Sequence, residues 1–195
     1  AVCRTDSLAI ISKAREIAEK FDMIRDDWNG YNFLNSSASR VGALDLSFIP
    51  GNDGYNINEI IANSKKGNID LVYLLGADEF DINQLSNSFI VYQGHHGDLG
   101  ASNADVILPG AAYPEKNSTY VNLEGRVQRA SRATFPPHEA REDWTIIRAL
   151  SDALKMSLPF NNLLELRRHM ENEFPTFNNI DIIQHSDWKP FGSNG

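Results

Sequence analysis

The sequence predicts an α/β fold in which helices flank a doubly wound, mostly parallel sheet. The clearest signal is Ile69–Leu75, a nearly continuous apolar run that is typical of a strand buried on both faces of a parallel sheet. Two more short apolar runs follow at Phe89–Tyr92 and Asp105–Leu108. Segments with helical periodicity occur along the same chain, and right-handed crossovers between parallel strands are the default for such units.

The first predicted helix is capped by Asp6 or Ser7 and runs to about Phe21. Apolar residues recur through it at helical spacing: Leu8, Ile11, Ala14, Ile17 and Ala18. A βαβ unit normally begins with a strand, whereas this chain opens on a helix. We therefore expect the first strand of the sheet to lie upstream of Ala1.

The next elements are short. Tyr31–Leu34 is a candidate strand, and Arg40–Leu46 is long enough for one or two helical turns. Asn56 and Glu59 have the spacing of a capping box and predict a helix that starts there. Gly67 is a suitable stop for that helix, because glycine adopts the left-handed conformation that often ends helices.

The second half contains an irregular stretch and two helices. Tyr113–Arg132 is predicted to be an extended loop or an irregular hairpin. Asp143–Lys155 is predicted to be a helix that buries Trp144, Ile147, Leu150 and Leu154, and Asn162–Phe174 is predicted to be another. We place an α/β domain at residues 1–155 and a helical and irregular extension at 156–195.

Composition excludes several functions. The chain has 195 residues and a formal net charge of −8, which disfavours nucleic-acid binding. No apolar run approaches the roughly 20 residues that a bilayer requires, so direct membrane insertion is not expected. Cys3 is the single cysteine, which excludes an internal disulfide and an iron–sulfur cluster ligated by this chain alone.

Gly76 follows the predicted strand at the edge where open α/β sheets bind ligands. It could contribute to a phosphate site, or it could simply permit a tight turn. Three carboxylates follow within five residues, at Asp78, Glu79 and Asp81. Because these like charges would repel a diphosphate, the turn interpretation is favoured.

Other polar clusters carry weaker signals. His95 and His96 stand with Asp98 in a glycine-rich loop, but adjacent side chains on an extended chain point apart, so no metal site is expected. Glu115–Lys116 and Glu124–Arg126 could serve acid–base chemistry or could be structural ion pairs. Arg126 could also clamp an anion through its planar guanidinium, which would suit a free-standing module for a small anion. No catalytic residue is predicted.

One group of motifs is much more specific. Ala104–Ala112, Glu115–Lys116, Thr119–Asn122 and Glu124–Gln128 follow one another with the spacing of a pattern found in the molybdopterin oxidoreductase family. Within it, the chain resembles the branch formed by the large iron–sulfur subunits of respiratory complex I. Four further stretches carry this second resemblance: Asp26–Gly30, Ala38–Asp45, Leu75–Asp78 and Tyr92–Asp98.

The resemblance implies the carboxyl-terminal α/β part of a molybdopterin-oxidoreductase-like domain. Active members have G-x-N-P where this chain has Gly76-Ala77-Asp78-Glu79, and Ser118 replaces a glycine of the family pattern. We therefore treat the positions that would meet a pterin cofactor as vestigial, and expect no cofactor or metal in this chain. These positions are Gly76, Asp78, Glu79, Gln93 and Arg126.

The resemblance also implies a setting. It predicts a scaffold that supports electron transfer from NADH to quinone and contacts other peripheral-arm subunits of complex I. Iron–sulfur clusters would be held by upstream cysteines of the parent subunit. The location would be the cytoplasmic face of a bacterial inner membrane, or the matrix side of the mitochondrial inner membrane. The alternative is a cofactor-binding domain of an active molybdopterin-dependent dehydrogenase.

Overall fold

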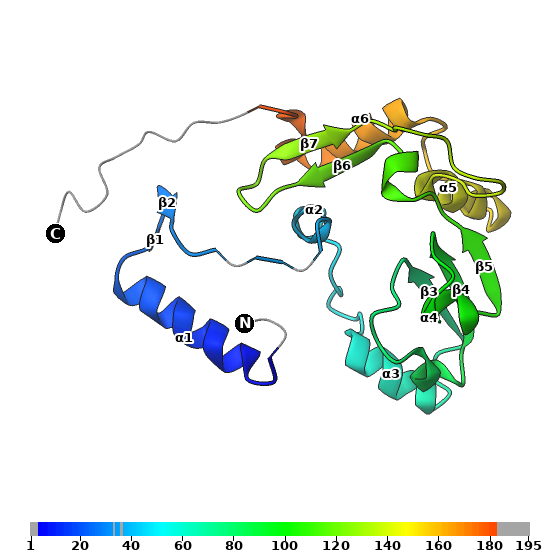
Figure 1. Cartoon of the computed structure of the whole chain (residues 1–195), viewed down its shortest axis with the longest axis horizontal. Helices are drawn as coiled ribbons and strands as arrows, with labels where there is room; N and C mark the ends of the chain where they lie inside the picture. Colours follow the sequence, from blue (N-terminus) through cyan, green and yellow to red (C-terminus); the bar gives the residue numbers. More distant parts are fainter. Residues whose placement is uncertain (1–3, 33, 36, 183–195) are drawn as a thin grey trace.

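The computed structural model describes residues 4–32, 34–35 and 37–182 (Figure 1). Cys3 and the last part of the predicted extension lie outside these residues. The elements, in chain order, are α1 Ser7–Lys20, β1 Ile24–Arg25, β2 Trp28–Asn29, α2 Arg40–Asp45, α3 Ile57–Lys65, β3 Leu71–Leu75, η1 Ile82–Leu85, β4 Phe89–Gly94, α4 Leu99–Ser102, β5 Val106–Pro109, η2 Tyr113–Glu115, β6 Ser118–Val121, β7 Val127–Ala130, α5 Asp143–Ala153, α6 Leu163–Glu173 and η3 Pro175–Asn178.

The three predicted strands of the parallel sheet are confirmed. They pair in the order β3-β4-β5, and both pairs are parallel. The register places Leu74 beside Tyr92 and Tyr92 beside Ile107. The prediction of an α/β fold with a parallel sheet is therefore correct.

One face of this sheet carries its main core. Leu74, Ile90 and Tyr92 from the strands pack with residues of η1, and Ile60 and Ile61 of α3 lie against them. The predicted burial of β3 on both faces is wrong, since Leu71 is 54% and Leu75 45% exposed. These two side chains point to the opposite face, and β3 is an edge strand of the described sheet.

The capping box of α3 is confirmed. The Asn56 side chain accepts hydrogen bonds from the backbone N–H of Asn58 (3.0 Å) and of Glu59 (3.1 Å). Glu59 returns the interaction by accepting from the Asn56 N–H at 2.8 Å. Just beyond the other end of the helix, Gly67 has a φ of +72°, as its predicted role as a stop requires.

We expect Asn56→Ala to lower the free energy of unfolding by about 1 kcal/mol, because two backbone donors at the start of α3 lose their acceptor. Asn58→Ala is the matched control. It changes an exposed asparagine in the same turn whose side chain is not the cap, and should stay within about 0.5 kcal/mol of the wild type. Urea unfolding of both variants measures the difference, and equal values would contradict the role of the cap.

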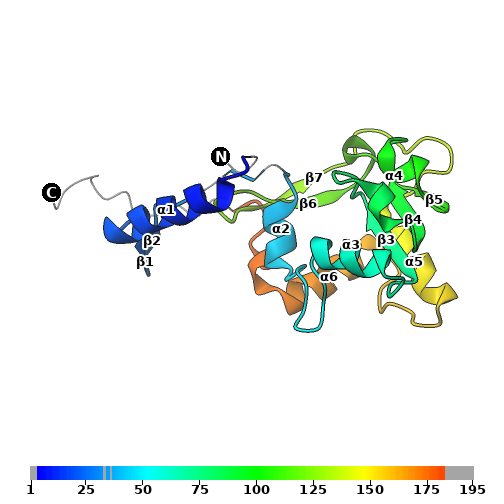
Figure 2. The same ribbon diagram turned by 90° about the horizontal axis from the view of Figure 1, so that it is seen from below.

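The stretch predicted as a loop or an irregular hairpin forms the antiparallel hairpin β6–β7. Val121 and Val127 of the hairpin and Phe177 of η3 form a second core. The partly buried residues packed against it come from α2, from α6, from the ends of these helices and from the chain just after η3: Val41, Leu46, Met170, Phe174 and Ile180. Figure 1 shows α6 along the hairpin, and Figure 2 shows α2 next to it. The division proposed at residue 155 stays a prediction.

The amino-terminal segment matches expectation only in part. Helix α1 is confirmed, but its predicted cap is wrong, since the Asp6 side chain makes no capping hydrogen bond and accepts from Arg4 at 2.7 Å instead. The strand predicted at 31–34 is also wrong, since the described residues there have no regular structure. The short antiparallel pair β1–β2 lies just before it instead. The Tyr31 hydroxyl donates to the Ile11 carbonyl at 3.2 Å, which ties this segment to α1. Leu8 of the predicted apolar stripe is 83% exposed, whereas Ala18 is buried.

Three further observations concern the helices. The predicted burial of Leu154 is wrong, because α5 ends at Ala153 and this side chain is 62% exposed. The second helix predicted in this half is confirmed as α6, and Asn162 caps it by accepting a hydrogen bond from the Glu165 N–H at 2.9 Å. Within the described residues, no helix combines the length and apolarity needed to cross a membrane.

Candidate functional site

The Gly76 turn lies at the carboxyl end of β3, where the sequence placed it. Gly76 has a φ of +59°, and its N–H donates to the Gln93 carbonyl at 2.7 Å. A Cβ built at this position would meet no atom within 4 Å. Glycine is therefore required here by the backbone conformation and not by the close approach of a neighbour, as the turn interpretation predicts.

Gln93, the adjacent candidate on β4, is fully buried. Its side-chain oxygen accepts a hydrogen bond from the Tyr73 hydroxyl, and its Nε2 donates to Asp143 Oδ1 at 2.9 Å. The other oxygen of Asp143 accepts from Lys116 Nζ. The carboxamide thus has a partner at both ends, in a chain of four side chains that joins the sheet to the start of α5.

The alternation of the strands explains this arrangement. Tyr73 on β3 and Gln93 on β4 point to the face opposite the main core, and Asp143 is the first residue of α5. A carboxylate in the first turn of a helix is also favoured by the helix dipole. Burial, together with the charge of Asp143, raises the pKa of Tyr73 above its usual 10.0, which keeps the hydroxyl protonated as a donor.

Asp78 approaches the other face of the sheet. Tyr92 is 3% exposed, and burial raises the pKa of its phenol, followed by the charges of Asp78 and Asp98 and a hydrogen bond with Asp78. Gly94 and Gly100 leave space for this ring, since a Cβ at either position would come within 2.3 Å of it. The acid at position 78 therefore has a partner within the chain.

The raised pKa of Tyr92 predicts a sensitivity to alkali. The unfolded chain releases the phenol proton near pH 10, before the folded chain does, so the free energy of unfolding should fall above about pH 10. Tyr92→Phe should reduce this slope, whereas Tyr55→Phe, at a half-exposed tyrosine, should retain it. Urea unfolding from about pH 8 to pH 11 measures both, and equal slopes would contradict the prediction.

Arg126 and Glu79 do not join this arrangement. Arg126 belongs to the turn of the hairpin, where its N–H donates to Asn122 Oδ1 at 2.8 Å. That turn points away from β3–β5 (Figure 1). Glu79 is exposed beside the Gly76 turn. The structure therefore unites Gly76, Asp78 and Gln93 along the end of the sheet and leaves Arg126 elsewhere.

These residues do not fit a pterin dinucleotide. The amide of Gln93 is already paired at both ends, and two acids follow the Gly76 turn. The arginine that could offset a diphosphate is on the hairpin turn. A diphosphate at this edge would meet negative charge, and none of the predicted pterin-site positions would place a cation beside it.

The histidine loop differs from expectation in one respect. The His95 and His96 rings do not point apart but meet edge to face, with centroids 4.3 Å apart, because the chain bends there instead of extending. Both side chains are exposed. In the described ranges, no group of three histidine, cysteine or acidic side chains has the arrangement of a metal site.

The two ion pairs considered for the irregular stretch are not formed. Glu115 accepts from the Ala112 N–H at 2.9 Å, and Lys116 pairs with Asp143. The backbone N–H groups of Glu124 and Arg126 both donate to Asn122 Oδ1. The contacts of Glu115 and Asn122 are local and shape turns, whereas the Lys116–Asp143 pair joins the residue after η2 to the start of α5.

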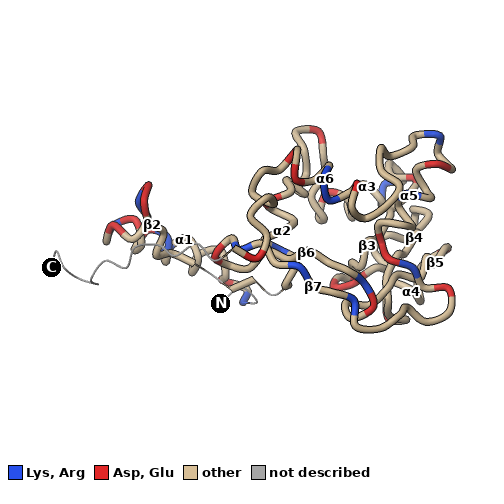
Figure 3. Tube along the Cα trace, turned by 90° about the horizontal axis from the view of Figure 1, so that it is seen from above, with Lys and Arg blue, Asp and Glu red and all other residues tan. Residues whose placement is uncertain are grey.

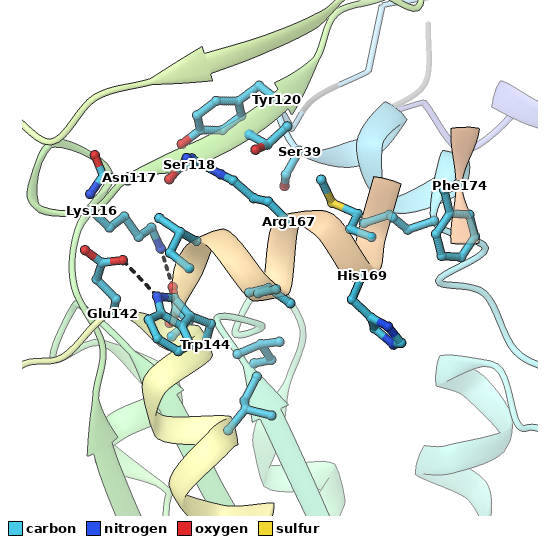
Figure 4. A pocket seen from close by; sticks show the side chains of 18 of the residues that line it. Ser39, Lys116, Asn117, Ser118, Tyr120, Glu142, Trp144, Arg167, His169 and Phe174 are labelled. Atoms are coloured by element: carbon cyan, nitrogen blue, oxygen red, sulfur yellow. Dashed lines mark hydrogen bonds and ion pairs between the residues drawn. The ribbon is translucent and has the colours of Figure 1, made fainter. Parts of the chain in front are cut away.

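A cleft of about 760 Å³ lies between the hairpin, α5 and α6 (Figure 4). Lys116, Trp144 and Arg167 are among the residues that line it, and Leu75 reaches it from the end of β3. Sequence reasoning missed Tyr73, Asp143 and Arg167. A glutamine directly after the apolar run of β4 was a signal for buried polar partners, but nothing local identified those partners.

Comparisons with known proteins agree with the motifs. The family described as molybdopterin oxidoreductase matches residues 1–153. The chain is 44% identical over 190 residues to a subunit of the NADH-quinone oxidoreductase of Rickettsia bellii, covering 97% of this chain and 26% of that protein. It is 48% identical over 180 residues to the mitochondrial NADH-ubiquinone oxidoreductase 78 kDa subunit of Candida albicans, covering 92% and 24%.

A third relative is the NADH-ubiquinone oxidoreductase 75 kDa subunit of Reclinomonas americana, 46% identical over 184 residues, which cover 93% of this chain and 26% of the relative. The chain thus spans about a quarter of the length of these proteins. Among solved structures, acetylene hydratase from Pelobacter acetylenicus shares the fold, with a TM-score of 0.53 and 16% identity over 68% of this chain and 22% of that one.

Proposed function

Since this chain belongs to the molybdopterin oxidoreductase family, we propose that it is a non-catalytic scaffold domain of a large iron–sulfur subunit of respiratory NADH–quinone oxidoreductase. Relatives with 44–48% identity over nearly the whole chain are named as subunits of that enzyme and support this assignment. In this role the domain supports electron transfer from NADH to quinone without carrying a redox centre.

One observation carries the non-catalytic part of the proposal. Gln93, at the end of the sheet, is fully buried and is bonded at both ends of its amide, to Tyr73 and to Asp143. A ligand would have to break this network, and it would meet Asp78 and Glu79 beside the Gly76 turn. The chain's own side chains thus satisfy polar groups that a cofactor would otherwise have to satisfy.

The supply of ligands points the same way. A cysteine-ligated iron–sulfur cluster needs several thiolates, and Cys3 is the one cysteine of this chain. We propose that the clusters of the parent subunit are held by cysteines upstream of this segment. Electrons then pass through those clusters, while the α/β domain provides a folded support.

The proposed partners are other peripheral-arm subunits of complex I. The net charge of −8 argues against a nucleic-acid partner, and acidic and basic positions are scattered over the elements in Figure 3. The proposed location is the cytoplasmic face of a bacterial inner membrane or the matrix side of the mitochondrial inner membrane. In either place the domain contacts the complex and does not enter the bilayer.

Metal and pterin analysis of the purified parent complex tests the proposal. We expect iron and sulfide in the amounts required by the clusters, and molybdenum, tungsten and released pterin far below one per chain. One molybdenum or tungsten per chain, together with a pterin, would contradict the scaffold role. That outcome would favour the second candidate, a cofactor-binding domain of an active molybdopterin-dependent dehydrogenase, which the same family motif supports.

A further inference from the structure

The cleft between the hairpin and α6 contains an arginine whose Nε has no hydrogen-bond acceptor among the described residues. Arg167 extends from α6 toward Ser118 and Tyr120 of β6 (Figure 4). Its Nε is buried and has no hydrogen-bond partner within the described residues. Buried donors are nearly always paired in folded proteins, so an unpaired guanidinium nitrogen in the wall of a cleft calls for an explanation.

The nearest acids are already engaged. Glu142 accepts from Trp144 Nε1 at 3.0 Å and faces Arg132 at 3.8 Å. Glu171 accepts from Arg129 at 3.1 Å. Three arginines therefore share two carboxylates, and the surplus positive charge is at Arg167. Burial lowers the pKa of Arg167, repulsion by Arg129 lowers it further, and the charges of Glu142 and Glu171 offset only part of this.

The remaining charges of the cleft are also paired. Asp143 binds Lys116, and Glu173 lies 3.2 Å from the His169 ring. Most of the wall is apolar and comes from α2, α5, α6 and their ends: Leu46, Trp144, Ile147, Leu163, Leu166, Met170 and Phe174. The cleft thus offers one guanidinium with an Nε that lacks an acceptor, beside an extended apolar surface.

We propose that this cleft binds an acidic peptide segment of a partner chain, with one carboxylate on Arg167 and a neighbouring apolar side chain against α6. The planar guanidinium fits a carboxylate, and one negative charge balances the one positive charge left over when three arginines share Glu142 and Glu171. A volume of about 760 Å³ lies within the roughly 300–1,000 Å³ of ordinary binding pockets. A diphosphate would add surplus charge beside Glu142 and Asp143. The inference rests on the proposed scaffold role for the existence of a partner chain.

Photo-cross-linking in the assembled parent complex tests this proposal. p-Benzoylphenylalanine in place of Tyr120, which lines the cleft, should cross-link to a segment that contains Asp or Glu next to an apolar residue. Arg167→Gln should reduce the yield about tenfold, the effect of losing one charged hydrogen bond. Arg168→Gln changes the adjacent, exposed arginine outside the cleft and should leave the yield unchanged.

Reversal of the charges sharpens the test. Arg167→Glu should abolish the cross-link, and Lys at the acidic position that the cross-link identifies should restore it. Three results would overturn the inference. The first is a cross-link only within the chain or to lipid, and the second is a cross-link to a segment without a carboxylate. The third is a yield that Arg167→Gln does not change. If the chain purifies with the complex but gives one of these three results, the inference fails while the scaffold role stands.

Unfolding of the variants separates binding from folding. Arg167→Met should not lower the melting temperature, because Arg167 Nε has no hydrogen bond to lose, and burial and repulsion by Arg129 outweigh the attraction of Glu142 and Glu171. Arg148→Met is the contrasting control, since Arg148 donates to the Phe160 carbonyl at 2.7 Å and to Asn161 at 2.9 Å, and should lower it. A loss at Arg167 as large as that at Arg148 would show a structural role and overturn the inference.

Discussion

Gln93→Leu should lower the free energy of unfolding by about 3 kcal/mol, although leucine nearly preserves the volume of the side chain. The reason is the network at the end of the sheet. Gln93 is fully buried, so its loss leaves the Tyr73 hydroxyl without an acceptor and removes the amide donor of Asp143. Chemical denaturation of the wild type and the variant measures the difference.

Gln128→Leu is the matched control, because that glutamine on β7 is exposed, and its effect should stay within about 0.5 kcal/mol. A double-mutant cycle with Tyr73→Phe should give a coupling energy of at least about 0.5 kcal/mol, since the two side chains share a hydrogen bond. A neutral Gln93→Leu would mean that the amide is free, and the case against a cofactor would lose its main support.

Phe177→Ala should cost about 3–5 kcal/mol, since it removes a large side chain from the core beneath the hairpin. The ring is 2% exposed and packs with Val121 and Val127. Phe135→Ala, at a 75% exposed position, should change stability by less than about 0.5 kcal/mol. Thermal or urea unfolding of both variants provides the comparison, and similar effects would contradict the second core.

The same variant bears on the predicted division at residue 155. Phe177 lies in the proposed extension, whereas the hairpin lies in the proposed α/β domain. Hydrogen exchange can follow the amides of β3–β5 and of β6–β7 separately. Faster exchange in the hairpin would show that the extension stabilises it. Unchanged exchange there would mean that the two parts are energetically separate.

Local signals in the sequence were sufficient for several elements. Asn56, Glu59 and Gly67 specify the ends of α3 through interactions within a few residues, and the structure reproduces them. The apolar runs of β3, β4 and β5 were also predicted correctly, because a run of apolar residues is a property of the adjacent sequence.

The predictions that the structure contradicts concern features that depend on long-range contacts. The burial of β3 depends on how many strands flank it, and here it is an edge strand with Leu71 and Leu75 exposed. Instead of the strand predicted at 31–34, the structure has the β1–β2 pair just before this segment and a hydrogen bond from Tyr31 to α1. The His95 and His96 rings meet because the loop bends, which an assumption of extended backbone could not reveal.

By itself, the sequence determined the class of fold, the family motifs and the acids after the Gly76 turn, because these are properties of contiguous residues. Only the tertiary structure decided that Gln93 is paired with Tyr73 and Asp143, that Arg126 lies away from them and that Arg167 lines a cleft without a partner for its Nε. Pairing of a buried polar group depends on atoms from segments that are far apart in the sequence. Tertiary packing sets the distance between those atoms in space.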